Sequence, residues 1–230
     1  MLHREVLNYT NYQMLFQDRT EAGQKLAQIL KPCVNHQDLL VLGLPRGGVP
    51  VAFEVAMSLN APLDVMLVRK LGIPGQEECA MGAIASGNIQ ILNWKIIERR
   101  QISKKAIALV ASREQQELER RQSAYRSDYT FTDICDRTVI LVDDGMATGA
   151  TMQAAVLAVR QQHPKQIIVA VPVAAPKIHA ELQTEVDKIV CIKIPEQFNS
   201  VSFWYQNFSQ TTDTEVSFLL HQAAKRNIAS

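Results

Sequence analysis

Two adjacent carboxylates stand between an apolar segment and a glycine-containing turn in VILVDDGMATGATM, residues 139–152. The four leading apolar residues predict a buried strand, and Asp143 and Asp144 follow it directly. After them, the segment 148–151 (TGAT) offers backbone N–H groups and two hydroxyls at the start of a predicted helix, which is a suitable place for a phosphate. The motif therefore puts two negative charges beside an anion site.

A ligand that carries both hydroxyl groups and a phosphate resolves this conflict. Carboxylates accept hydrogen bonds from vicinal sugar hydroxyls, while amides one turn later hold the phosphate of the same sugar. The chain contains no Gly-Lys dipeptide, so the motif is not a Walker A loop, and it lacks the GxGxxG spacing of a dinucleotide site. The motif predicts a site for a ribose 5-phosphate unit.

A second motif, Leu44-Pro45-Arg46-Gly47-Gly48-Val49, follows the apolar run 39–44. Paired glycines between a strand and a helix let the backbone approach a ligand closely. Arg46 adds a planar donor that suits phosphate oxygens. The alternative is a tight turn with a solvent-facing arginine.

A third motif is the basic pair Arg69 and Lys70, which follows the apolar run 63–68 and precedes a segment with two glycines and a proline. Two cations at a strand end can contribute to an anion site. A solvated basic pair before a turn is the alternative reading.

The elements expected to position these motifs alternate along the chain. Five apolar runs are predicted to form strands: 39–44, 63–68, 139–142, 167–173 and 189–194. Five segments are predicted to form helices: about 20–30, 50–59, 103–126, 151–162 and 177–184. This alternation predicts an α/β fold in which a parallel twisted sheet is flanked by helices, and such sheets bind ligands at the carboxyl ends of their strands.

Composition excludes several classes of protein. With 230 residues, 47% of them apolar, and a net charge of +1, the chain is expected to form one core without the basic field of a dedicated nucleic-acid or membrane binder. The segment MLHREVLNYTNY has no signal-peptide core, and the longest apolar run is too short for a membrane span. The charged segment 102–126, with pairs such as Glu117 and Arg121, predicts a solvated helix instead of a nucleic-acid patch.

Cysteine and histidine spacing indicates neither disulfides nor zinc. The four cysteines are dispersed, and the histidines show no HExxH pattern. We expect reduced thiols and a cytoplasmic protein.

The motif VILVDDGMATGATM resembles the signature of type I phosphoribosyltransferases, which bind 5-phosphoribosyl 1-diphosphate (PRPP) with Mg2+. PRGG resembles the pyrophosphate loop of that family, and Arg69-Lys70 resembles a basic pair found in several members. The match extends over about 39–194. FQDRTEAGQKLAQIL and SFWYQNF resemble an uncharacterised branch of predicted phosphoribosyltransferases.

The resemblance implies a Rossmann-like sheet with a small hood and one domain over residues 1–230, with a core at about 39–194. The hood would come from about 1–20 and 195–210, and the segment at about 103–126 would be a helical insertion.

The implied reaction transfers ribose 5-phosphate from PRPP to a nitrogenous base and releases pyrophosphate, with Mg2+ as cofactor. Asp143 and Asp144 would bind the ribose hydroxyls, directly or through the metal. The 5-phosphate would lie on Ala147, Thr148, Gly149, Ala150 and Thr151. The pyrophosphate would face Arg46, Gly47, Gly48, Arg69 and Lys70.

The catalytic residues implied in this way are Asp143, Asp144, Arg46, Lys70 and Glu78. Leu71 to Ala80 would form a mobile loop that closes over the reacting centre, poorly ordered without ligand. In the 6-oxopurine branch of the family an acidic residue stands at the position of Ala147. Adenine phosphoribosyltransferases have alanine there, as this chain does. Glu77 or Glu78 is then the candidate for proton transfer, and a solvated carboxylate is the alternative.

The acceptor is not identified, and it need not be a purine or pyrimidine. Four aromatic residues of the hood would stack on it or form a small core: Phe198, Phe203, Trp204 and Tyr205. The partners expected are PRPP and a nitrogenous base or another small-molecule acceptor, with no membrane and no nucleic acid.

A homodimer is expected, because Arg69 and Lys70 would lie where relatives form a two-fold interface. A regulator that senses PRPP or a nucleotide without turnover is the alternative function. Other ribosyl-phosphate chemistry, such as phosphorolysis, is a third.

Overall fold

The computed structural model describes residues 15–34, 38–125 and 132–228. Its main sheet has five parallel strands in the order β2-β1-β6-β7-β8. The strands are β1 (Leu39–Gly43), β2 (Leu63–Val65), β6 (Thr138–Val142), β7 (Gln166–Val173) and β8 (Lys188–Lys193). Every residue of β1 and β6 is buried, because helices cover both faces of the sheet. The predicted α/β class with a parallel sheet is confirmed.

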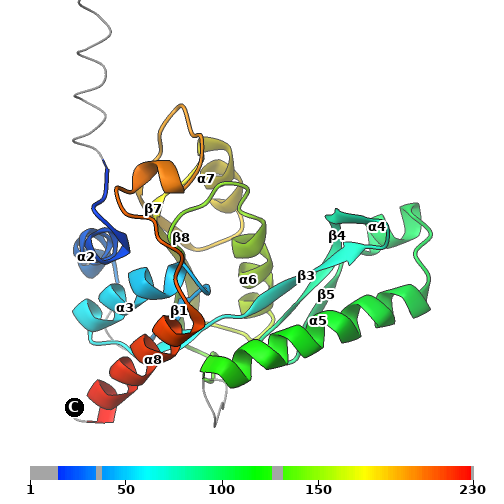
Figure 1. The fold of residues 1–230 in the computed structure, drawn as a ribbon, viewed down its shortest axis with the longest axis horizontal. Helices are drawn as coiled ribbons and strands as arrows, with labels where there is room; N and C mark the ends of the chain where they lie inside the picture. Colours follow the sequence, from blue (N-terminus) through cyan, green and yellow to red (C-terminus); the bar gives the residue numbers. More distant parts are fainter. Residues whose placement is uncertain (1–14, 35–37, 126–131, 229–230) are drawn as a thin grey trace, which may run out of the picture.

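Helices form a layer on each face of the sheet (Figure 1). One layer contains α2 (Arg19–Leu30), α3 (Gly48–Leu59) and α8 (Asp213–Ile228), and the other contains α6 (Ala150–Arg160) and α7 (Pro176–Leu182). Successive strand residues alternate between the two: Val41 packs in the first core and Leu42 in the second. Two short 3-10 helices complete the body: η1 (Lys31–Cys33) and η2 (Ser202–Trp204).

A second, antiparallel sheet leaves this body as an arm, which we define as residues 68–125. It contains β3 (Val68–Ile73), β4 (Gln76–Ala85) and β5 (Ile89–Leu92), followed by α4 (Trp94–Arg99) and α5 (Lys104–Tyr125). In Figure 1 the long helix α5 runs beside the strands of the arm and returns the chain to the body.

The prediction of one strand at 63–68 was wrong. Strand β2 ends at Val65, and β3 begins at Val68 in the other sheet. The change of partner occurs at Leu67, whose N–H donates to Ser86 Oγ at 3.1 Å and whose carbonyl accepts from Ser86 N–H at 2.9 Å. Arg69 and Lys70 therefore lie inside an arm strand and not at the carboxyl end of the parallel sheet. A mostly apolar run does not reveal that its two ends belong to different sheets.

The predicted loop Leu71–Ala80 is also corrected. It forms a β3–β4 hairpin in which Gly72 pairs with Ala80 and Ile73 with Gln76, with register irregularities on both sides of Gly72. The tight turn is Pro74-Gly75, where Gly75 has φ +79°. Proline and glycine suit such a turn, which allows the segment to continue as paired strands.

The five predicted helices are confirmed as α2, α3, α5, α6 and α7, to within a few residues at the ends that the structure describes. β4, β5, α4 and α8 have no counterpart among the predicted elements. All four cysteines are free thiols, as expected. No helix in the described part of the chain is long and apolar enough to cross a membrane.

Candidate active site

The PRGG turn and the acidic pair meet because β1 and β6 are neighbouring parallel strands. The N–H of Leu44 donates to the carbonyl of Val142 at 2.9 Å, which continues the pairing beyond the strand ends. A Cβ atom at Gly47 would overlap the Asp144 carboxylate, and one at Gly48 would lie 2.7 Å from the Val142 carbonyl oxygen. Glycine is required at both positions by this close approach.

The two carboxylates of the site are held in a partly buried turn. Asp143 Oδ1 accepts the N–H of Asp144 at 2.9 Å. Burial raises the pKa of Asp143 well above its ordinary value, and the charge of Asp144 raises it further. Burial also raises the pKa of Asp144, although Arg19 acts in the opposite direction. A bound cation, or a ligand that donates hydrogen bonds to the carboxylates, would stabilise the charged form of both groups and lower their pKa values.

Arg19 is the cation closest to this pair, and its contact with the site was not predicted. Its Nε donates to Asp144 Oδ2 at 2.8 Å and its Nη1 donates to the carbonyl of Ser209 at 2.7 Å. The guanidinium also lies 3.9 Å from the ring centroid of Phe208. Arg19 is the first residue of α2, whose start is fixed by the Asp18 side chain accepting from the Glu21 N–H. No sequence signal links Arg19 to a carboxylate 125 positions away.

The predicted hood segments lie side by side. The N–H of Phe16 donates to the backbone carbonyl of Trp204 at 2.9 Å, and the N–H of Gln206 donates to the backbone carbonyl of Phe16 at 2.8 Å. The Tyr205 hydroxyl donates to the backbone carbonyl of Asp144 at 2.6 Å, and burial raises the pKa of this tyrosine. Tyr205 thereby ties the hood to the acidic turn.

The small-core interpretation of the aromatic residues is confirmed for two of the four. Trp204 and Tyr205 are buried together with Phe16, and Phe198 packs against them partly buried. Phe203 is 49% exposed and remains available to a ligand.

The predicted phosphate loop turns directly into α6. Gly149 has φ +67°, and a Cβ atom there would overlap the side chain of Ile178 from α7. Ala147 and Thr148 are exposed, while α6 begins at Ala150. The first N–H groups of a helix have no partner within it, so this end offers donors to an anion.

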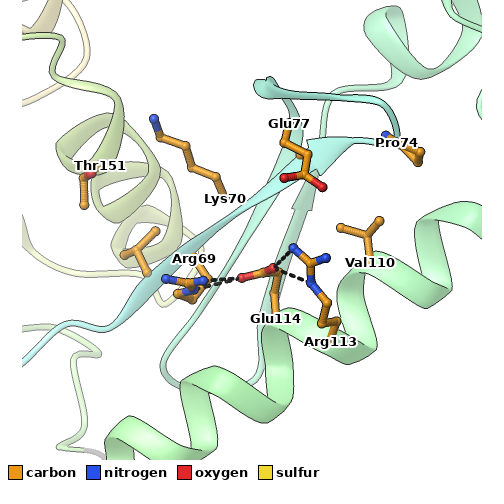
Figure 2. Close-up of a pocket in the computed structure, with 10 residues that line it drawn as sticks. Arg69, Lys70, Pro74, Glu77, Val110, Arg113, Glu114 and Thr151 are labelled. Carbon is orange, nitrogen blue, oxygen red and sulfur yellow. Dashed lines mark hydrogen bonds and ion pairs between the residues drawn. The ribbon is translucent and has the colours of Figure 1, made fainter.

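A pocket of about 320 Å³ lies between this helix end and the arm (Figure 2). Residues from both sides line it: Arg69, Lys70, Glu77, Arg113, Glu114 and Thr151. A much smaller pocket of about 20 Å³ is lined by Pro45, Arg69 and Thr151. Arg69 therefore lies between the PRGG turn and the phosphate loop, so all three sequence motifs are neighbours.

Arg46 faces a different pocket, of about 420 Å³, which it lines with Arg19, Gly47, Asp144 and Phe208. Its Nη1 lies 4.0 Å from the Asp213 carboxylate at the start of α8. The peptide bond between Pro45 and Arg46 is cis. The Arg46 side chain is 36% exposed, which makes it accessible to a ligand.

Other predicted residues differ in their placement. Lys70 is exposed and lines both the arm pocket and an apolar cleft of about 610 Å³ against α6. Glu77 is exposed and lines the arm pocket. The side chain of Glu78 lies outside the described part of the structure.

Glu114 is a further residue that sequence reasoning missed. Its carboxylate binds Arg69 at 2.6 Å, although it belongs to the helix predicted to be solvated. A signal was present: Glu114 falls between Ile107 and Leu118 on the buried stripe of α5.

Comparison with known proteins identifies the family. The family model described as the phosphoribosyl transferase domain matches residues 16–206. Rv0571c from Mycobacterium tuberculosis (strain ATCC 25618 / H37Rv), named "Putative phosphoribosyl transferase", is 42% identical over 209 residues, covering 91% of this chain and 47% of that protein. MT0597 from strain CDC 1551 / Oshkosh matches to the same extent. The chain thus spans about half the length of these curated relatives.

Solved structures agree with this assignment. TT1426 from Thermus thermophilus has a TM-score of 0.83 and 40% identity, with 91% of this chain and 99% of that chain covered. AQ2163 from Aquifex aeolicus, at 12% identity and a TM-score of 0.50 over 86% of this chain and 88% of its own, shares the fold alone. The chain belongs to the phosphoribosyl transferase domain family.

Proposed function

We propose that this chain transfers ribose 5-phosphate from PRPP to a nitrogenous base with Mg2+ and releases pyrophosphate. The observation that carries the proposal is the convergence of three loops. Gly47 and Gly48 hold the PRGG turn against the acidic pair, and Pro45 of that turn lines a small pocket together with Arg69 and Thr151. Hydroxyl acceptors, amide donors and fixed cations are thus adjacent, and PRPP needs all three.

Each part of PRPP has a matching group. The ribose hydroxyls would donate to Asp143 and Asp144, and the 5-phosphate would accept from the N–H groups at the start of α6. The pyrophosphate would lie in the arm pocket beside Arg69, because the pocket of about 20 Å³ between Arg69 and the PRGG turn is too small for it. Lys70 lines the same arm pocket and would contribute a second cation.

The acidic pair also suits Mg2+. Mg2+ in such enzymes is bound by one or two carboxylates together with substrate phosphates and water. Among the described residues, no three potential ligands cluster, so a substrate would have to complete the coordination. The hydrogen bonds of the pair use Asp143 Oδ1 and Asp144 Oδ2, which leaves one carboxylate oxygen on each as a hard donor. Bound Mg2+ would stabilise negative charge on the departing pyrophosphate.

The protein's own residues have two further tasks. Arg69, which Glu114 holds, would bind the pyrophosphate as charge grows on it, since a fixed donor needs no reorganisation during the reaction. Arg46 faces the pocket beside Asp144 and would approach the ligand from there. The β3–β4 hairpin would close over the site and exclude water. Of the two candidates for proton transfer, Glu77 and Glu78, the structure describes the side chain of Glu77. It lines the arm pocket and could accept a proton from the base.

Closure of the hairpin is testable by hydrogen exchange. Backbone amides of residues 71–79 should become more protected when Mg-PRPP binds. Equal protection with and without ligand would contradict the role of the hairpin as a lid.

The function itself is tested by a release assay. Purified protein is incubated with Mg-PRPP and a panel of nitrogenous bases, and pyrophosphate and nucleotide are measured together. Equal amounts of both products with one base support the proposal. Binding of Mg-PRPP without release for any base would favour the sensing alternative, and absence of binding would refute both.

A homodimer is part of the proposal and is tested by light scattering over a range of concentrations. The position of Arg69 does not require a partner subunit, because Glu114 of the same chain holds it.

A further inference from the structure

We infer that Glu114 of α5 is a positioning residue that holds Arg69 ready for the pyrophosphate group of PRPP. The inference rests on the proposed function and adds to it a residue from the inserted helix. Glu114 itself would not touch the substrate. It would act through Arg69, which lies between the PRGG turn and the phosphate loop.

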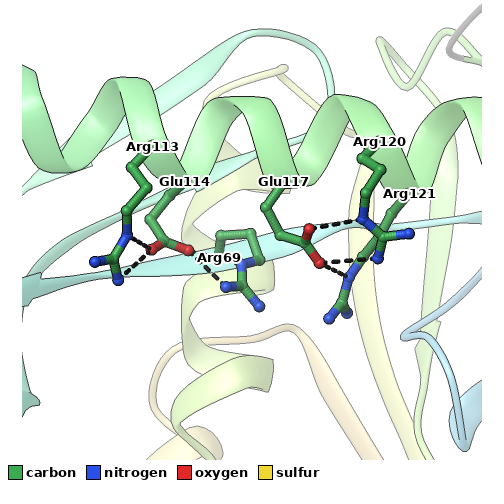
Figure 3. A network of polar contacts seen from close by, with 6 residues as sticks. All are labelled: Arg69, Arg113, Glu114, Glu117, Arg120 and Arg121. Atoms are coloured by element: carbon green, nitrogen blue, oxygen red, sulfur yellow. Dashed lines mark hydrogen bonds and ion pairs between the residues drawn. The ribbon is translucent and has the colours of Figure 1, made fainter.

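The geometry of the pair is specific (Figure 3). Arg69 donates from both Nε and Nη2 to Glu114 Oε2, at 2.9 and 2.6 Å. The other oxygen, Oε1, accepts a hydrogen bond from Arg113 Nε at 3.2 Å and forms an ion pair with Arg113 Nη2, also at 3.2 Å. The Glu114 side chain is only 8% exposed, so two guanidinium groups compensate a nearly buried carboxylate.

This arrangement leaves part of Arg69 available. A guanidinium has five N–H donors, and Glu114 takes one on Nε and one on Nη2. The remaining donors, including both on Nη1, are not used by any other hydrogen bond among the described residues. The side chain is 32% exposed and lines the arm pocket, so these donors can reach a ligand. The carboxylate thus fixes one edge of the guanidinium and leaves the other edge for phosphate oxygens.

Glu114 has two opposing effects on pyrophosphate binding, and its removal would change the affinity in opposite directions depending on which effect is larger. Its negative charge disfavours an anion in the pocket, so its removal would strengthen pyrophosphate binding if charge were decisive. Its hydrogen bonds restrict a long flexible side chain, so its removal would weaken binding if positioning were decisive. Positioning should prevail, because two arginines already neutralise the Glu114 charge. Among the described residues, no other side chain forms a hydrogen bond or ion pair with Arg69.

The experiment compares Glu114→Gln with the parent by calorimetric titration of three ligands: Mg-PRPP, Mg-pyrophosphate and ribose 5-phosphate. Glutamine keeps the shape but removes the charge that anchors the guanidinium. We expect roughly five- to thirtyfold weaker binding of the two pyrophosphate-containing ligands. Binding of ribose 5-phosphate should stay unchanged, because its sites are the acidic pair and the phosphate loop.

Glu117→Gln is the matched control. Glu117 lies on the same helix and also binds two arginines, Arg120 and Arg121, but none of the three lines the arm pocket (Figure 3). Arg121 instead lines the pocket of about 20 Å³, which is too small for a pyrophosphate group. It should bind all three ligands like the parent. Melting curves of both variants separate a folding defect from a binding defect. If Glu114→Gln is unstable, Glu114→Asp serves as a second variant, because it keeps the charge. It should recover part of the affinity.

A double-mutant cycle with Arg69→Ala tests whether Glu114 acts through Arg69. In the Arg69→Ala background, Glu114→Gln should have no further effect on pyrophosphate binding. An equal loss in both backgrounds, unchanged binding by Glu114→Gln, or tighter binding would each overturn the inference. A parent protein that does not bind Mg-PRPP would instead overturn the proposed function, and the role of Glu114 with it.

Discussion

Two arginine–carboxylate pairs stabilise the candidate site from opposite sides. At the edge of the parallel sheet, Arg19 of α2 binds Asp144 at 2.8 Å. In the arm, Glu114 of α5 binds Arg69 at 2.6 Å. The interaction is the same, but the roles are exchanged: the carboxylate is the proposed ligand-binding group in the first pair, and the arginine is in the second.

The burial of the two pairs differs in a way that matters for binding. Arg19 and Asp144 are both nearly buried, with 11% and 14% of their side chains exposed. In the arm, Glu114 is 8% exposed but Arg69 is 32% exposed. A ligand can therefore reach Arg69 without disturbing its partner, whereas a ligand at Asp144 must share the carboxylate with Arg19. Arg19 should therefore contribute mainly to stability, and Arg69 mainly to binding.

The largest effect is expected from removing both charges of the acidic pair. The double variant Asp143→Asn, Asp144→Asn keeps shape but loses two charge-assisted interactions, each worth about 1.5–3 kcal/mol. Affinity for Mg-PRPP, measured by calorimetry, should fall by roughly two to four decades if the effects add. The melting temperature should fall by less than in Arg19→Ala, because removing two charges that burial disfavours offsets the loss of the ion pair with Arg19.

The opposite pattern would identify a purely structural turn. Marked loss of thermal stability with unchanged affinity would mean that the aspartates only cap the backbone. That result would remove the ribose-phosphate interpretation of the motif.

Arg69→Ala should have the next largest effect. Loss of one charge-assisted phosphate contact should weaken Mg-PRPP binding roughly tenfold to a hundredfold. Mixing this variant with the double aspartate variant tests whether Arg69 acts within its own chain. No recovery of binding is expected, since Arg69 and Thr151 of one chain line one pocket. Recovery on mixing would show that Arg69 completes the site of a partner subunit.

Arg19→Ala should separate the two pairs most clearly. It removes hydrogen bonds to Asp144 and Ser209 and the contact with Phe208. The free energy of unfolding, from chemical denaturation, should fall by about 1–3 kcal/mol, because a nearly buried carboxylate loses its partner. Affinity for Mg-PRPP should change by less than about tenfold, because Asp144 remains. A larger loss of affinity than of stability would place Arg19 in the binding site and remove the contrast between the pairs.

The smallest effect is expected at Glu117. Hydrogen bonds from Arg120 and then Arg121 lower its pKa from 4.5 to about 2. Because the folded-state pKa lies below the ordinary value, this pair contributes stability above pH 4.5 and loses it as pH falls through about 2. All three side chains are substantially exposed, so Glu117→Gln should lower the melting temperature at neutral pH by no more than about 4 °C.

The pH dependence provides the check on this prediction. The difference in melting temperature between parent and variant should shrink as the pH is lowered from 4.5 toward about 2. A difference that is independent of pH would mean that packing of the side chain, and not its charge, stabilises α5.

Local sequence determined two strands of the parallel sheet and two of the loops of the candidate site. Apart from Gly43, the runs 39–44 and 139–142 are apolar at every position, which is typical of strands covered on both faces. Gly149 and the residues next to it in the chain specify a turn into a helix without any contribution from other segments. These features depend on neighbouring residues alone, so periodicity and turn chemistry were sufficient to predict them.

The sequence did not determine where the arm begins. The run 63–68 reads as one strand, and only the pairing of Leu67 with Ser86 assigns its end to another sheet. Pro74-Gly75 suits either a mobile loop or a hairpin, and the partner strand decides between them. Strand pairing is a choice among distant segments, which no local pattern encodes.

Tertiary structure alone decided which groups support the site. Arg19 lies 125 positions from Asp144, and Glu114 lies 45 positions from Arg69. Nothing in either local sequence specifies its partner, although Glu114 on an apolar stripe indicates that some partner must exist. Charged side chains are long and tolerate many surroundings, so their pairing is fixed only when the fold buries one of them. The sequence by itself determined the loops that are proposed to bind ribose phosphate, and the fold determined the side chains that hold those loops in place.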